Sequence, residues 1–300
     1  MEAPTAAIDR SKRRFRTRYA SIIIVGVIAA LSIVIALSIV LPKRTSRSSR
    51  SIFILLPLYI YPNTSNWNPL YEVLRDHRDV NFTVILNPND GPGLTSSPGP
   101  EYLACIQNLT IYRNVRTVGY VRTGWSSRNL SSVLMDVATY SGWRDLVNDT
   151  SSMSVHGIFF DETPSEYTPA SAEYLQKINK AVKTAPGIAA EKFVIHNPGT
   201  ITDPRLQDDS TDLTVVFENS YDEYKKQESV LSSLPEDRSR YAYLIHSIST
   251  ISGRNLKRFV QSISKHAEAL FLTSLQEDYY EAFGSQWKEV VQAVDDLNGS

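Results

Sequence analysis

The sequence predicts an α/β protein in which one closed (β/α)8 barrel of the TIM type follows a single N-terminal transmembrane helix. Residues 20–41 contain no charged side chain. From residue 52 onward, short continuous apolar runs alternate with amphipathic segments, which is typical of a parallel sheet covered by helices on both faces. Eight such units in about 250 residues match the size of a closed barrel.

The apolar segment 20–41 is long enough to cross a membrane. At ~1.5 Å per residue it spans a hydrocarbon layer of ~30 Å. A cleaved signal peptide would have a shorter apolar region and a small-x-small cleavage site, so a signal anchor is the better interpretation. Basic residues flank both ends and are in excess on the N-terminal side, which favours a cytoplasmic N-terminus. They are Arg10, Lys12, Arg13, Arg14, Arg16 and Arg18 before the segment, and Lys43, Arg44, Arg47 and Arg50 after it.

The chain therefore divides into a short basic cytoplasmic tail (1–19), a transmembrane signal anchor (20–41), a linker rich in Ser and Arg (42–51) and a barrel domain (52–300). We expect a single-pass type II membrane protein whose domain is lumenal or extracellular. The Lys43-Arg44 pair in the linker is a candidate processing site. Six Asn-x-Ser/Thr glycosylation acceptors support this topology: Asn63, Asn81, Asn108, Asn129, Asn148 and Asn298.

The composition limits the covalent cross-links and the classes of partner that we expect. The single cysteine, Cys105, excludes an internal disulfide framework, which a domain with a large core does not need. The formal net charge is −1, and no basic stripe with interleaved aromatic residues occurs in the domain. Nucleic acid is therefore not an expected partner.

The elements of the barrel follow in order along the chain. The predicted strands are the apolar runs 52–58, 80–86, 116–121, 155–160, 192–196, 213–217, 241–245 and 269–272. The predicted helices are the amphipathic segments near 67–77, 99–113, 128–147, 168–184, 221–233, 253–266 and 279–296. Only the connection between the fifth and sixth strands lacks a helical pattern, and its polar residues 200–212 predict an irregular segment. An open doubly wound sheet is the alternative, but the chain has no Gly-rich nucleotide loop.

Two predicted strands end in carboxylates. The run from Gly157 to Phe160 leads directly into Asp161 and Glu162, and the run from Leu213 to Phe217 leads into Glu218. Ionised carboxylates are disfavoured in apolar surroundings, so acids at the ends of core strands indicate a site that uses charge. Acids at the ends of neighbouring parallel strands are the groups that cleave a glycosidic bond. We therefore take these three acids as the candidate catalytic residues.

The other strand exits are rich in amides and aromatic rings. Sugars offer hydroxyl groups to amides and C–H faces to rings, so this mixture suits a carbohydrate-binding cleft. The alternative is that the rings seal the barrel end and that the Asn-Pro and Asp-Gly pairs only form turns. The candidate substrate-binding residues are Tyr59, Tyr61, Asn87, Asp90, Tyr120, Thr123, Trp125, Asn197, Asn219, Tyr221 and His246.

Six motifs at these strand ends resemble the spherulin-4 family of fungi and slime moulds over roughly residues 52–275. They are Pro57–Pro62, Ile85–Gly93, Val118–Thr123, Gly157–Glu162, Asn197–Gly199 and Val216–Glu218. The chain is most similar in pattern to the membrane-anchored fungal members classed as glycoside hydrolase family 135. That resemblance implies a (β/α)8 barrel, an acidic triad at Asp161, Glu162 and Glu218, and endo-cleavage of α-1,4-linked N-acetylgalactosamine in galactosaminogalactan, a secreted adhesive polysaccharide.

The linkage implied by the resemblance constrains the mechanism. In an α-linked N-acetylgalactosamine the acetamido group is cis to the leaving oxygen, so it cannot act as the nucleophile, and a carboxylate must attack or activate water. We expect Asp161 as the nucleophile, Glu218 as the acid/base and Glu162 as a group that tunes the charge of the site. Acids on neighbouring barrel strands tend to lie close together, so we expect retention of anomeric configuration.

Two other functions remain as alternatives. A non-catalytic carbohydrate-binding or cell-wall barrel associated with spherulation would need only the aromatic and amide rim. A metal-dependent deacetylase would need clustered His and Asp ligands. The five histidines, His77, His156, His196, His246 and His266, form no close pair in the sequence. We therefore expect no metal site and no cofactor.

Overall fold

The computed structural model describes residues 51–63, 65–146, 153–235, 237–248 and 251–299. The predicted tail, the predicted span 20–41, nearly all of the linker and the acceptor Asn148 lie outside the described residues. Within the described ranges, no helix has the length and apolar character needed to cross a membrane.

Eight parallel strands form a closed barrel in chain order, and the last strand pairs with the first. The strands are β1 (Phe53–Leu58), β2 (Phe82–Leu86), β3 (Val115–Arg122), β4 (Gly157–Asp161), β5 (Phe193–Asn197), β6 (Leu213–Ser220), β7 (Tyr241–His246) and β8 (Ala269–Leu272). This arrangement confirms the predicted closed barrel. All the strands run the same way, so their carboxyl ends, and the loops that follow them, meet at one end of the barrel.

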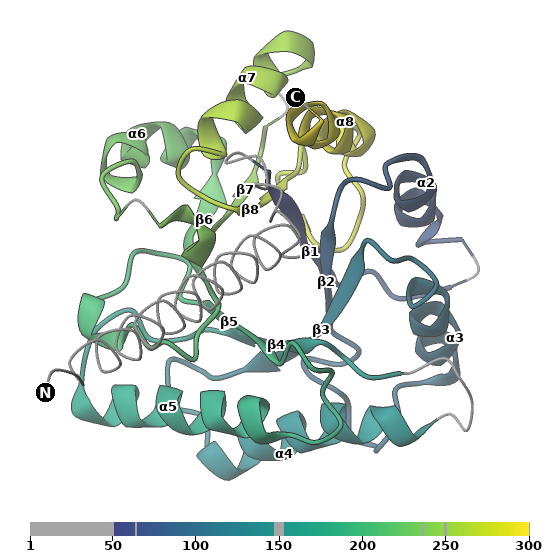
Figure 1. The fold of residues 1–300 in the computed structure, drawn as a ribbon, viewed down its shortest axis with the longest axis vertical. Coiled ribbons are helices and arrows are strands. Elements are labelled where there is room, and N and C mark those ends of the chain that lie inside the picture. Colours follow the sequence, from purple (N-terminus) through teal and green to yellow (C-terminus); the bar gives the residue numbers. More distant parts are fainter. Residues whose placement is uncertain (1–50, 64, 147–152, 236, 249–250, 300) are drawn as a thin grey trace, which may run out of the picture. The chain divides into compact units, whose positions relative to one another are not determined.

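Helices form a ring outside the sheet (Figure 1). They are α2 (Asn68–Asp76), α3 (Pro100–Leu109), α4 (Leu130–Gly142), α5 (Pro169–Thr184), α6 (Tyr221–Leu231), α7 (Gly253–Ile263) and α8 (Trp287–Asn298). Short 3-10 turns occupy Trp143–Leu146, Pro204–Leu206 and Arg238–Arg240. The β5–β6 connection contains only the second of these turns, as its polar sequence predicts.

The largest difference from the predicted helix boundaries is at the last helix. The last helix was expected over 279–296, but α8 begins at Trp287 and residues 279–286 belong to the loop after β8. Gly284 lies in this loop, where a Cβ atom would approach the hydroxyl of Ser274 to 2.7 Å. The prediction for 279–286 was wrong because these residues pack toward the carboxyl end of the barrel instead of continuing the helix.

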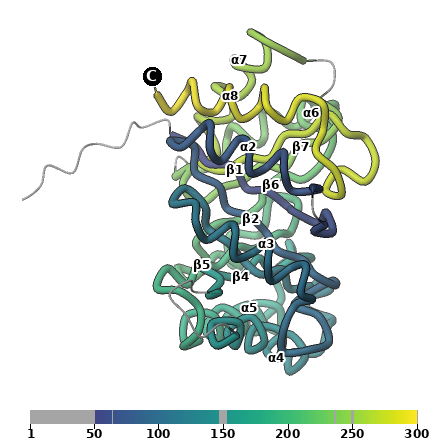
Figure 2. Tube along the Cα trace, turned by 90° about the vertical axis from the view of Figure 1, so that its right-hand side faces the viewer, coloured from purple at the N-terminus to yellow at the C-terminus, as the bar shows by residue number. Residues whose placement is uncertain are grey.

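Helix α8 closes the ring beside α2, and both views show the two helices side by side (Figures 1 and 2). Oδ2 of Asp295 accepts a hydrogen bond from Nδ1 of His77 at 2.7 Å. At the end of the helix, the side chain of Asn298 pairs with the backbone of Ile52 in both directions: its oxygen accepts from the Ile52 N–H at 2.9 Å, and its nitrogen donates to the Ile52 carbonyl at 3.0 Å. The seam of the barrel is therefore fastened to residues next to β1.

A β-bulge in β6 changes which way its last residues face. The register between β6 and β7 shifts between Val215 and Phe217. Phe217 packs edge-on against Tyr224 of α6, with ring centroids 5.7 Å apart, and Val216 lines a cavity outside the sheet. Two consecutive side chains thus point outward, so the next residue, Glu218, points into the barrel. Bulges commonly redirect a side chain beside an active site in this way.

Candidate active site

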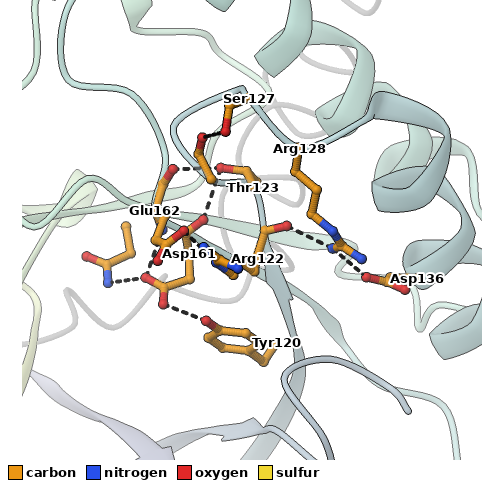
Figure 3. Close-up of polar contacts among 10 residues, drawn as sticks. Tyr120, Arg122, Thr123, Ser127, Arg128, Asp136, Asp161 and Glu162 are labelled. Atoms are coloured by element: carbon orange, nitrogen blue, oxygen red, sulfur yellow. Dashed lines mark hydrogen bonds and ion pairs between the residues drawn. The ribbon is translucent and has the colours of Figure 1, made fainter. Parts of the chain in front are cut away.

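Asp161 is the last residue of β4 and is held by three hydrogen bonds. The Tyr120 hydroxyl donates to its Oδ2 at 2.8 Å, and the Asn197 side-chain nitrogen donates to its Oδ1 at 2.8 Å. The backbone N–H of Glu162 also donates to Oδ1, at 2.9 Å. Figure 3 shows Tyr120 pointing at this carboxyl group from the neighbouring strand. The side chain is therefore fixed in position at the carboxyl end of the barrel.

Glu218, in β6, points into the carboxyl end of the barrel, where Asp161 also lies. Its Oε2 accepts from the side-chain nitrogen of Asn197 at 2.6 Å, and its Oε1 accepts from the hydroxyl of Tyr280 at 2.5 Å. Both carboxyl oxygens therefore have a donor, and both donors come from other elements of the barrel.

One amide group joins the two acids. Asn197 is the last residue of β5, and the structure leaves it only 5% exposed. Its oxygen accepts from the Gly199 N–H at 3.0 Å, which leaves its nitrogen to face Asp161 and Glu218. The two acceptor oxygens lie 2.8 and 2.6 Å from this nitrogen, so they are at most about 5.4 Å apart, which is shorter than the ~6.5–9.5 Å between the carboxyl groups of inverting glycosidases.

The turn after β5 positions Glu218 as well. Gly199 adopts a left-handed φ of 66°, and its carbonyl accepts the Glu218 N–H at 3.0 Å. A Cβ added at Gly199 would be in van der Waals contact with Glu218, 3.6 Å from its Cβ, so the turn passes close to this acid. The Asn-Pro-Gly sequence is therefore both the amide bridge and the support of the second acid.

Burial raises the pKa of both acids, because an apolar site disfavours the charged form. For Asp161, the hydrogen bonds from Tyr120, the Glu162 N–H and Asn197 oppose that rise. For Glu218, the hydrogen bonds from Tyr280 and Asn197 oppose it, and the nearby charge of Asp161 adds to it. Asp161 therefore has one more donor that stabilises its ionised form than Glu218 has, while the charge of Glu162 raises the pKa of Asp161 as the charge of Asp161 raises the pKa of Glu218.

Glu162 follows directly but turns elsewhere. Its backbone has a left-handed φ of 53°, and its Oε2 accepts from Nε of Arg122 at 2.7 Å. The Thr123 hydroxyl donates to the carbonyls of Asp161 and Glu162, at 3.0 and 2.7 Å. Thr123 is fully buried, so it holds the backbone of the two acids. The adjacent acids therefore have separate environments, as Figure 3 shows.

The loop after β3 presents an exposed indole beside these acids. Gly124, Trp125 and Ser126 are consecutive left-handed residues, with φ of 59°, 52° and 69°. The backbone N–H of Trp125 donates to the backbone carbonyl of Glu162 at 2.6 Å. Its side chain is 62% exposed. Left-handed backbone in non-glycine residues is strained and is maintained only where surrounding contacts impose it.

Arg128 supplies part of that constraint. Its Nη1 donates to the carbonyl of Arg122 at 2.9 Å and to Oδ2 of Asp136 at 2.7 Å (Figure 3). The Ser127 hydroxyl donates to the Gly124 carbonyl at 2.5 Å. The strained turn is thus tied to helix α4 and to the end of β3.

Tyr59, just after β1, lies between the two tyrosines that hold the acids. Its ring packs edge-on against Tyr120 and Tyr280, with centroids 5.5 and 5.4 Å apart. Burial raises the pKa of its phenol well above the ordinary value, and the nearby charges of Asp161 and Glu218 raise it further. Three protonated phenols therefore line the space around the acids.

The remaining rim residues take different places. Tyr61 is 58% exposed and packs edge-on against Tyr102. Asn87 accepts the Gly91 N–H at 2.9 Å, so its oxygen shapes the loop after β2, and Asp90 is exposed in that loop with a left-handed φ of 51°. His246 stacks on Tyr279 with centroids 4.4 Å apart.

Two predicted rim residues are not brought to the acids. Asn219 follows Glu218 in β6, and its exposed side chain accepts from the Ser220 N–H at 2.7 Å. Successive strand side chains face opposite ways, so Asn219 points away from the space that Glu218 faces. Tyr221 begins α6 and packs against Phe259 of α7 outside the barrel.

Sequence reasoning missed two residues of the site, Tyr280 and Arg122. Tyr280 falls in the segment expected to be helical, and no residue was proposed for the exit of the eighth strand. The barrel rule supplies the missing signal, because the loop after every strand reaches the same end. Arg122 lies within a motif of the sequence, but its pairing with Glu162 depends on the turn after β4.

The structure describes five of the six predicted glycosylation acceptors. Asn63, Asn81, Asn108 and Asn129 are exposed. Asn298 is half-buried, and both polar atoms of its side chain already bond to Ile52. A glycan on its nitrogen would displace that pairing.

Fold and site together define a (β/α)8 barrel with a hydrogen-bonded pair of carboxyl groups at the carboxyl ends of its strands. The sequence model described as "Spherulation-specific family 4" matches residues 53–294. The chain belongs to this spherulin-4 family.

Two known proteins are similar to this chain in sequence or structure. Spherulin-4 of Physarum polycephalum is 30% identical over 176 residues, which cover 59% of this chain and 47% of the relative. The chain thus spans about half the length of the curated relative it matches. The crystal structure of Aspergillus clavatus Sph3 in complex with GalNAc is similar with a TM-score of 0.79 and 37% sequence identity, and the match covers 82% of this chain and 98% of that one.

Proposed function

We propose that this protein is a glycoside hydrolase that cleaves an extracellular amino-sugar polysaccharide, with endo-cleavage of α-1,4-linked N-acetylgalactosamine as its reaction. The observation that carries the proposal is the bridging of Asp161 and Glu218 by the amide of Asn197. The match to Aspergillus clavatus Sph3 covers most of this chain, and that protein was crystallised with GalNAc. The bound sugar supports the choice of substrate.

The geometry suits a double displacement. Asp161 attacks the anomeric carbon while Glu218 donates its proton to the departing glycosidic oxygen, and a covalent glycosyl-aspartate forms. Glu218, now ionised, then takes a proton from water, whose oxygen attacks the anomeric carbon and releases Asp161. The close approach of the two acids favours this route, because it leaves little room for a water between Asp161 and the sugar.

The environments of the acids support these roles. Asp161 has three donors that stabilise a carboxylate, which suits a nucleophile. Glu218 is buried and lies near the charge of Asp161, and both effects raise its pKa, which suits an acid that must hold a proton until the bond breaks. Glu162 is paired with Arg122, so its role is to balance charge at the rim and not to touch the anomeric carbon.

The exposed rings suit a polymer rather than a single sugar. Trp125 and Tyr61 are the two large aromatic side chains most exposed among the described residues, at 62% and 58%. Both belong to loops at the carboxyl end of the barrel, and flat aromatic surfaces bind the C–H faces of sugar rings. Neighbouring sugar units of a chain can rest on them while one unit lies over the acids.

We further propose that the barrel is the lumenal or extracellular part of a type II membrane protein anchored by residues 20–41. The support is the charge-free segment, its basic flanks and the exposed acceptors.

The deciding experiment incubates the full chain with a partly N-acetylated α-1,4-galactosamine polymer and, separately, with unrelated glucans. Mass spectrometry of the products should show internal cleavage of the first polymer only, and the anomeric proton of the first product should be that of the α-anomer. A β-product would refute the double displacement. Binding of the polymer without any product, in a sample where Asp161→Asn behaves identically, would establish the non-catalytic carbohydrate-binding alternative.

A further inference from the structure

A cavity of about 230 Å³ lies on the outer side of β5 and β6, away from the acids. It occupies the place where the ring of helices has no member, because the β5–β6 connection contains only the 3-10 turn Pro204–Leu206. Its walls come from the strands, from α5, from this connection and from the segment that follows α6. In Figure 1 the ribbon between α5 and α6 runs as loops at this position.

The strand side of the cavity is unusually polar for the outer face of a barrel. His196, Thr214 and Tyr241 lie in register across β5, β6 and β7, and all three line the cavity. The outer face of a barrel strand ordinarily packs apolar side chains against a helix. This row therefore lacks the usual covering and presents hydrogen-bonding groups instead.

The histidine of this row has an acceptor without a protein partner. His196 is 5% exposed, and its Nε2 lies 2.7 Å from Oδ1 of Asn179. The nitrogen of Asn179 donates to Ser210 and Thr211, at 3.1 and 2.9 Å, so the oxygen of Asn179 faces the ring and Nε2 carries the hydrogen. Burial lowers the pKa of His196 to about 4. The ring is neutral at physiological pH, and within the described part of the chain its Nδ1 has no hydrogen-bond partner.

A second buried polar atom in the wall is also unsatisfied. Thr163 is 2% exposed, and its hydroxyl has no hydrogen-bond partner among the described residues. Most buried polar groups in native proteins do have partners. Neither Nδ1 of His196 nor the Thr163 hydroxyl bonds to a protein group of the described ranges, so hydrogen-bonding capacity is left over among the residues that line the cavity.

The rest of the lining defines the chemistry of that occupant. Leu175, Leu206, Val216 and Leu234 supply apolar surface. Arg240 supplies a cation: its Nη2 donates to the backbone carbonyls of Asp208 and Thr211, at 2.9 and 3.2 Å, and no carboxylate of the described ranges pairs with it. A half-buried guanidinium without an anionic partner, next to apolar surface, is complementary to a carboxylate.

We propose that this cavity binds a small, largely apolar carboxylic acid that carries a hydroxyl group. The carboxylate pairs with Arg240, the hydrocarbon body lies among the leucines and Val216, and the hydroxyl donates to Nδ1 of His196. An apolar cavity of ~150 Å³ is enough to hold benzene, so the volume here suits a single substituted ring or a short branched chain.

The cavity lies directly behind the candidate active site. Thr163 follows Glu162, His196 precedes Asn197, and Val216 belongs to the bulge that directs Glu218 inward. The proposal does not depend on the chemistry of those acids, and its test uses binding alone.

The test measures saturation-transfer NMR of 4-hydroxybenzoate with the full chain, and uses 4-hydroxybenzyl alcohol as the neutral match. We expect saturable binding of the acid. Arg240→Gln should weaken binding of the acid at least about tenfold and leave the alcohol nearly unchanged, in keeping with the loss of a charge-assisted hydrogen bond. Arg254→Gln, which removes an exposed cation on α7, should change neither.

Cavity filling provides the second arm. Leu206→Trp should abolish binding of both probes, and Leu234→Phe should weaken it, with folding of each variant checked by its thermal melting curve. If Leu206→Trp does not fold, Leu234→Phe carries this arm. Absence of saturable binding to the folded parent chain, or binding that persists undiminished in a folded cavity-filling variant, would overturn the proposal and leave water as the occupant.

Discussion

The hydroxyl of Tyr280 donates to Oε1 of Glu218 at 2.5 Å, although the two residues are separated by two strands of the barrel wall. Burial raises the pKa of Glu218, and this hydrogen bond opposes the rise. Tyr280 therefore sets how readily Glu218 holds a proton.

The substitution Tyr280→Phe should make Glu218 a weaker acid. With Glu218 as the general acid, the alkaline limb of the kcat/KM profile should move to higher pH, because that limb reports its deprotonation in the free enzyme. Tyr112→Phe, in the loop after α3 where the ring stacks on Tyr71 of α2, serves as the control and should leave the profile in place. Movement of the acidic limb alone would instead identify Glu218 as the group that must be ionised.

Removing either charge should stop turnover without unfolding the protein. Asp161→Asn and Glu218→Gln keep the shape of each side chain, so we expect folded variants with activity reduced on the order of a hundredfold or more. The exposed acids Asp209 and Glu289 provide matched controls as Asp209→Asn and Glu289→Gln. Near-parental rates in both site variants on a verified substrate would place the chemistry elsewhere.

The leaving group should separate the roles of the two acids. A good aryl leaving group hardly needs protonation, so Glu218→Gln should slow ordinary glycosides far more than activated aryl glycosides. Asp161→Asn should slow both equally, because the attack itself is lost. Steady-state rates on the two substrate types measure this difference, and the reverse pattern would exchange the assignments.

The buried acids should also affect stability. Their pKa values are raised above the ordinary 3.8 of Asp161 and 4.5 of Glu218. A carboxyl group that binds its proton more tightly in the folded chain stabilises the fold below its unfolded pKa, and this contribution is lost as the pH rises through the folded pKa. Ionisation of these acids as the pH rises therefore lowers the free energy of unfolding.

Glu218→Gln should accordingly melt at or above the parent temperature once the pH exceeds the folded pKa of Glu218. The amide oxygen can accept from Asn197 while its nitrogen donates to the oxygen of Tyr280, so both contacts have a replacement. Below about pH 4 the parent acid is protonated and the advantage should disappear. Thermal melting curves across this range check the sign, and an advantage that grows on acidification would contradict it.

The proposed membrane topology predicts that the barrel carries N-linked glycans. Endoglycosidase treatment of protein from its native host should lower the apparent mass, because four exposed acceptors lie on the described surface. Asn298 should remain unmodified in folded protein, since its amide is already paired with Ile52. An unchanged mass, together with protease sensitivity of the barrel on the cytosolic side of sealed membranes, would reverse the orientation.

The barrel was predictable because its signals are local. Each strand is a continuous apolar run bounded by polar segments. The polar stretch 200–212 correctly predicted that the connection between β5 and β6 contains no α-helix. The first acid was predictable for the same reason, since Asp161 ends a strand.

The remainder of the site depends on tertiary contacts. Glu218 lies inside β6, and only the bulge near Val216 turns it toward the interior. Simple alternation from Leu213 would place it on the outer face. Tyr280 reaches the site through a loop whose sequence has a helical pattern, and the pairing of its hydroxyl depends on a residue 62 positions away.

The pairing of Asn298 with Ile52 spans 246 positions, which bears on how the chain matures. At ~5 to 20 residues per second, residue 298 is synthesised on the order of tens of seconds after residue 52. During that interval the newly made β1, whose six residues are all buried in the finished barrel, has neither its β8 partner nor the amide that secures its start. Contacts of such long range form slowly, so the apolar first strand keeps an unpaired edge until the seam closes.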